Sequence, residues 1–121
     1  MPEKIFGVVD VSDQRDSAAK MLGKIGYSVT TLTCGEEAVK FMRDNSADLL
    51  ILDMIMDPGI DGLETYKRII QTTPGQKAII TSGYSESARV LEAQRLGVGT
   101  YIKKPYNLEQ IGVAVRTELD A

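Results

Sequence analysis

The stretch Leu49-Leu50-Ile51-Leu52-Asp53 contains four consecutive apolar residues and ends in a carboxylate. A strand that is apolar on successive residues is covered on both faces, as the strands of a parallel sheet are. Four more short apolar runs lie at residues 5–9, 27–32, 78–81 and 100–102. Amphipathic stretches with apolar residues three and four apart follow the runs. We therefore expect an α/β chain of five parallel strands and five helices.

Length and charge indicate a single domain that does not bind nucleic acid directly. The 121 residues contain no repeat, low-complexity stretch or linker, so we expect one domain over residues 1–121. The net charge is −3 and the basic residues are scattered, which does not favour binding to phosphate backbones. No apolar run is long enough to cross a membrane, and Cys34 is the only cysteine. We expect a cytoplasmic protein without membrane insertion.

The chain has no histidine, and this restricts its chemistry. Nucleophile activation by histidine, histidine metal sites and phosphohistidine on this chain are excluded. Carboxylate and carbonyl oxygens remain, and they suit hard cations such as Mg²⁺. The search for a site therefore turns to aspartate and glutamate.

Four polar residues follow the expected strands: Asp10, Asp53, Ser82 and Lys104. Ligands of open parallel sheets bind at the carboxyl ends of the strands, so these residues should meet at one edge. Two carboxylates there repel each other unless a cation lies between them, which predicts a bound Mg²⁺. Asp53 could then attack phosphorus while Lys104 neutralises the transferred oxygens. Any one of the four alone would more simply be a loop residue, but the set favours a site.

Five motifs extend this picture over nearly the whole chain: Val8-Val9-Asp10, Leu49-Leu50-Ile51-Leu52-Asp53-Met54, Asp61-Gly62, Ile80-Thr81-Ser82-Gly83 and Lys103-Lys104-Pro105-Tyr106. Together they resemble the receiver domain of bacterial response regulators. The resemblance implies a flavodoxin-like, doubly wound (βα)5 fold with strand order 2-1-3-4-5. It also implies a two-component phosphorelay, in which a histidine kinase or phosphotransfer protein phosphorylates the chain and a downstream protein target reads the altered surface.

The resemblance also implies a role for each matching residue. Asp53 would be the phosphoacceptor, and Mg²⁺ would be held by Asp10, Asp53 and the backbone carbonyl of Ile55. Ser82 would be the switch hydroxyl, and Tyr101 the aromatic residue that changes rotamer with it. Lys104 would complete the catalytic set. Such a chain catalyses at most its own phosphorylation and dephosphorylation.

Two departures from the family pattern bear on the metal. Receivers have two consecutive acidic residues after the first strand, whereas Asp10 is flanked by Val9 and Val11. Counting along the chain favours Val9 as the substitution, with Val11 as the alternative, and either should weaken Mg²⁺ binding. The loop at residues 56–62 also appears one residue longer than usual. Its Asp57 could partly replace the lost charge, although a turn role before a proline is favoured. Similar loops occur in receivers attached to sensor kinases.

Other functions are kept as alternatives. A pseudo-receiver would retain the fold and signal without phosphate, because one acidic residue of the pocket is a valine. A phosphohydrolase would want a second carboxylate where Ile55 lies, and a flavodoxin-like electron carrier would want a glycine-rich phosphate loop after the first strand, which is missing. Metal titration and phosphodonor labelling separate the first alternative from a working receiver.

Overall fold

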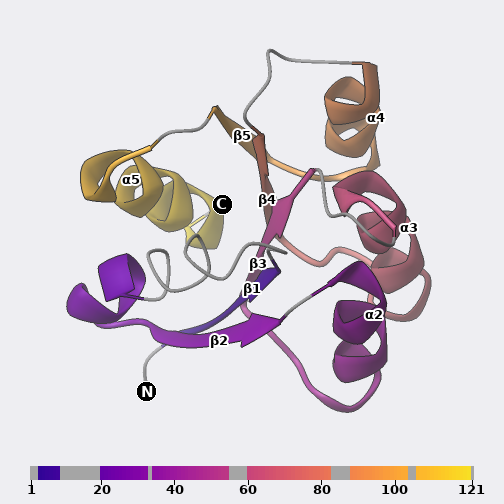
Figure 1. Ribbon diagram of the computed structural model, residues 1–121, viewed down its shortest axis with the longest axis horizontal. Coiled ribbons are helices and arrows are strands. Elements are labelled where there is room, and N and C mark those ends of the chain that lie inside the picture. The colour runs from indigo at the N-terminus through magenta and orange to yellow at the C-terminus, as the bar shows by residue number, and fades with distance from the viewer. Residues whose placement is uncertain are drawn as a thin grey trace.

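The computed structural model describes residues 3–8, 20–32, 34–54, 60–82, 88–103 and 106–120. All five strands form one parallel sheet in the order β2-β1-β3-β4-β5 (Figure 1). The strands are β1 Lys4–Val8, β2 Ser28–Leu32, β3 Leu49–Asp53, β4 Ala78–Ser82 and β5 Thr100–Lys103. This confirms the expected α/β class and strand order.

Helices cover both faces of the sheet, as Figure 1 shows. They are α2 Gly35–Asp44, α3 Gly62–Thr72, α4 Ala88–Leu96 and α5 Leu108–Leu119, and residues 20–24 are also helical. In Figure 1, α2, α3 and α4 lie on one side of the strands, whereas α5 and the helical residues 20–24 lie on the other. The chain is therefore a doubly wound, three-layer structure.

The strand β3 lies at the centre of the sheet and is buried at all five positions. Leu50 and Leu52 point into a cluster beneath α2, α3 and α4, which we call the α3-side cluster. Leu49 and Ile51 point the other way, into a cluster with residues of α5, which we call the α5-side cluster. This alternation explains why the strand is apolar on successive residues.

The strand order creates the place for a site. The first strand pairs with β2 on one side and with β3 on the other, so the connections that leave β1 and β3 pass to opposite faces of the sheet. Two later helices begin with side-chain caps near the same edge. Asp61 accepts from the Glu64 amide at 2.9 Å, and Asn107 forms a capping box with Gln110.

Candidate functional site

Asp53 is the last residue of β3 and lies at the carboxyl edge of the sheet. It is only 4% exposed, and its register partner in β4 is Thr81, whose carbonyl accepts a 2.8 Å hydrogen bond from the Met54 amide. Ser82, the next residue of β4, is 3% exposed. A buried carboxylate is costly unless cations or hydrogen bonds compensate it. The environment of Asp53 is therefore one that favours a positive partner.

The structure brings three of the predicted site residues to neighbouring strands. Asp53 ends β3, Ser82 ends β4, and Tyr101 lies in β5 in register with Ile80 of β4. The residues Asp10, Ile55 and Lys104, together with Val9, Val11 and Asp57, lie outside the described residues. Their roles remain predictions.

A buried carboxylate offers the oxygen ligands that Mg²⁺ prefers, so Asp53 fits the expected metal. Within the described ranges, no three histidine, cysteine or acidic residues are grouped closely enough to hold a metal ion. Because Asp10 and the Ile55 carbonyl lie outside those ranges, this observation leaves the expected Mg²⁺ site a prediction.

The start of α3 is packed against the backbone of Asp53 and Met54. The Gly62 amide donates to the Met54 carbonyl at 2.9 Å. A Cβ atom at Gly62 would lie 2.7 Å from the Asp53 carbonyl oxygen and 3.0 Å from the Met54 Cα, both backbone atoms that cannot move aside cheaply. Only glycine allows this approach. In the sequence, Gly62 stands out only as part of the Asp61-Gly62 motif, and its packing against the backbone of Asp53 was not predicted.

An ion pair joins the start of α3 to the start of α4. Arg89 Nε donates to Asp61 Oδ2 at 2.6 Å. Burial alone would raise the pKa of Asp61, but the hydrogen bonds from Arg89 and from backbone amides outweigh it and hold that pKa below its usual value. The pair connects the two helices that follow Asp53 and Ser82 in the chain. Because 28 residues separate its partners, no local pattern signals it.

Tyr106 lies between β5 and α5. Its ring packs against the α5-side cluster. Burial, and then the negative charge of Asp53, raise the pKa of the Tyr106 hydroxyl above its usual value. In the sequence, this residue stands out only as the end of the Lys103-Lys104-Pro105-Tyr106 motif, and the effect of Asp53 on its pKa was not predicted.

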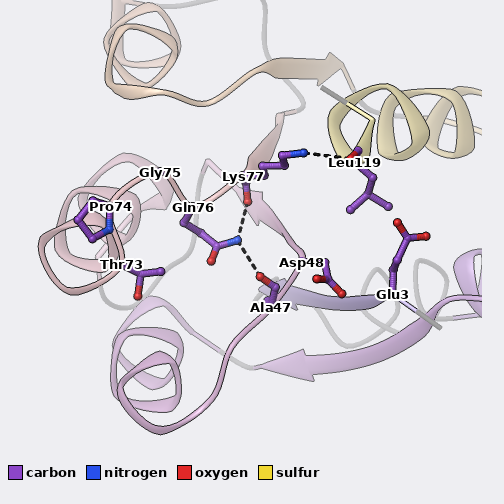
Figure 2. Close-up of a pocket in the computed structure, with 9 residues that line it drawn as sticks. All are labelled: Glu3, Ala47, Asp48, Thr73, Pro74, Gly75, Gln76, Lys77 and Leu119. Carbon is purple, nitrogen blue, oxygen red and sulfur yellow. Dashed lines mark hydrogen bonds between the residues drawn. The ribbon is translucent and has the colours of Figure 1, made fainter. Parts of the chain in front are cut away.

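The opposite edge of the sheet holds a pocket of about 350 Å³, drawn in Figure 2. Its polar groups serve the fold: Gln76 Nε2 donates to the carbonyls of Ala47 and Lys77, and Lys77 Nζ donates to the Leu119 carbonyl at 3.0 Å. Asp48 accepts from the Lys4 amide at 2.7 Å. These bonds link the residues before β3 and β4 to each other, to β1 and to the end of α5. We therefore assign this edge a structural role.

Residues 5–116 match the family model of the response regulator receiver domain. The chain is 32% identical over 119 residues to sporulation initiation phosphotransferase F of Bacillus subtilis (strain 168), with 98% of this chain and 95% of that protein covered.

None of the helices within the described ranges is long and apolar enough to cross a membrane.

Solved structures agree on the fold. A receiver domain protein (CheY-like) from Methanospirillum hungatei JF-1 superposes with a TM-score of 0.92 at 24% identity, covering 99% of this chain and 95% of that one. The receiver domain of DrrB, solved in a form described as BeF3 activated, superposes with a TM-score of 0.85 at 26% identity, and all of both chains is covered.

Proposed function

This chain belongs to the response regulator receiver domain family, and from that premise we propose that Asp53 accepts a phosphoryl group from the phosphohistidine of a partner histidine kinase or phosphotransfer protein. The observation that carries the proposal is the buried carboxylate of Asp53 at the carboxyl edge of the sheet, next to Ser82. A carboxylate without a function would be expected in solvent instead.

The chemistry is a transfer to oxygen. A carboxylate oxygen of Asp53 attacks the phosphorus, the P–N bond of the partner's phosphohistidine breaks, and an acyl phosphate forms while the imidazole leaves and takes up a proton. Asp10, Asp53 and the Ile55 carbonyl would hold Mg²⁺, which supplies positive charge for the transferred oxygens. The Lys104 ammonium would provide the second positive charge. With a valine in one acidic position, we expect weak metal binding and slow phosphorylation.

The output is a change of surface. The new charge on Asp53 would draw the Ser82 hydroxyl inward, and the Tyr101 ring would follow, so that a pre-existing second conformation gains population. This proposal treats residues 1–121 as one cytoplasmic receiver domain that acts through a downstream protein. Loss of the switch would leave phosphorylation without consequence for that target.

The test is intact-mass analysis after incubation with acetyl phosphate and Mg²⁺. We expect one added phosphoryl group on the wild type, no addition to Asp53→Ala, and no addition when a chelator removes the metal. Asp44→Ala removes an exposed carboxylate at the end of α2 and serves as the matched control, which should be labelled normally. An unlabelled wild type that also binds no Mg²⁺ would support the pseudo-receiver instead.

A further inference from the structure

Tyr106 follows β5 and is half-buried against the α5-side cluster. Side chains alternate along β3, and Leu49 and Ile51 point into that same cluster. The next position in this alternation is Asp53, so the carboxylate and the Tyr106 ring lie on the same face of the sheet. The effect of Asp53 on the pKa of the Tyr106 hydroxyl agrees with this placement.

Packing alone accounts for the ring of Tyr106 but not for its hydroxyl. A phenylalanine would fill the same apolar space. Two other tyrosines use their hydroxyls structurally: Tyr66 donates to the Gln76 carbonyl at 2.9 Å, and Tyr27 accepts from Arg116 at 3.4 Å. The Tyr106 ring packs on the face of the sheet to which Asp53 points, and burial, followed by the charge of Asp53, raises the pKa of its hydroxyl. A phenol is protonated near neutral pH and can therefore donate a hydrogen bond to an anion.

We propose that Tyr106 is a phosphoryl-binding residue of this site, whose hydroxyl donates a hydrogen bond to the group that Asp53 carries. The inference rests on the proposed function of Asp53. Phosphorylation adds a group with a charge of about −1.5 to −2 at neutral pH, so a fixed donor beside Asp53 interacts more strongly with the phosphorylated form. The Tyr106 hydroxyl thereby stabilises the phosphorylated state. Tyr106 then contributes more than packing.

Beryllofluoride with Mg²⁺ tests this at equilibrium, because its fluorine atoms accept hydrogen bonds as phosphoryl oxygens do. The affinity is measured by calorimetry for the wild type, Tyr106→Phe and Tyr27→Phe. Tyr27 packs against the same cluster but directs its hydroxyl to Arg116, so it is the matched control. We expect Tyr106→Phe to bind beryllofluoride on the order of tenfold more weakly, the loss of one hydrogen bond to a charged group. The affinity for Mg²⁺ alone should not change.

A spectroscopic measurement separates this role from a structural one. With tyrosine labelled by ¹³C at Cζ, the signal missing in Tyr106→Phe is assigned to Tyr106, and it should shift when beryllofluoride binds to the wild type. Equal affinities of wild type and Tyr106→Phe, with an unmoved signal, would overturn the inference while leaving Asp53 as the acceptor. A wild type that binds no beryllofluoride would overturn both the inference and the proposed function.

Discussion

Replacing Gly62 by alanine should destabilise the protein, because the new Cβ would lie 2.7 Å from the Asp53 carbonyl oxygen. Overpacking of this kind costs about 1–3 kcal/mol. If α3 moved away from β3 to relieve this contact, the 2.9 Å hydrogen bond from the Gly62 amide to the Met54 carbonyl would also weaken. Losing that bond would destabilise the protein by about 1 kcal/mol more. The unfolded alanine variant has less backbone entropy than the unfolded wild type, which offsets about 0.5–1 kcal/mol of this destabilisation. We therefore expect a net loss of about 2 kcal/mol.

Urea denaturation measures this loss, with Gly23→Ala as the control. Gly23 lies in the helical residues 20–24, and a Cβ there would contact none of the other described residues within 4 Å. Alanine at position 23 should therefore stabilise the protein by about 0.5–1 kcal/mol. Because Gly62 packs against the backbone of Asp53, Gly62→Ala should also slow the proposed labelling of Asp53 by acetyl phosphate. If Gly62→Ala were as stable as wild type within about 0.5 kcal/mol, the close approach of α3 would be wrong.

Two further predictions concern interactions away from Asp53. The pKa of Asp61 is lowered in the folded protein, so its ion pair with Arg89 stabilises the fold above the unfolded value of 3.8 and is lost as the pH falls through the lower folded value. At neutral pH and low salt, the wild type should be more stable than Arg89→Gln by up to about 1 kcal/mol. This difference in stability, measured by thermal melts, should shrink as the pH falls below 3.8 and Asp61 becomes protonated, whereas a difference that does not change with pH would contradict the assignment. Tyr66→Phe should cost about 1–2 kcal/mol, because it leaves the buried Gln76 carbonyl without its 2.9 Å donor; denaturation curves that coincide with wild type would mean that this bond adds nothing.

Local pattern was sufficient to predict the elements of the fold. The alternation of apolar runs and amphipathic stretches predicted five strands and their helices, and β3 is buried at every position. Strand limits moved by at most one residue; β4, for example, extends to Ser82. The order 2-1-3-4-5, which the family resemblance implied, is confirmed. The strands and helices could be predicted from pattern because each depends on residues within a few positions of one another, whereas the strand order came from the resemblance.

Sequence position also placed the chemical groups of the candidate site at strand ends. Asp53 and Ser82 end neighbouring parallel strands, and the carboxyl ends of such strands meet at one edge. Their position at one edge of the sheet could therefore be predicted from the sequence, whereas their chemical roles stay predictions. The assignments of Asp10, the Ile55 carbonyl and Lys104 remain predictions, since these residues lie outside the described ranges.

The sequence by itself determined the fold class, the absence of histidine chemistry and the concentration of polar groups at one edge of the sheet. Only the tertiary structure decided that Gly62 lies against the backbone of Asp53, that Arg89 pairs with Asp61, and that Tyr106 packs on the same face of the sheet as Asp53. Periodicity describes which face of an element is buried, because burial repeats along one segment. Contacts between segments depend on how their surfaces fit, and that fit is settled only when the whole chain packs.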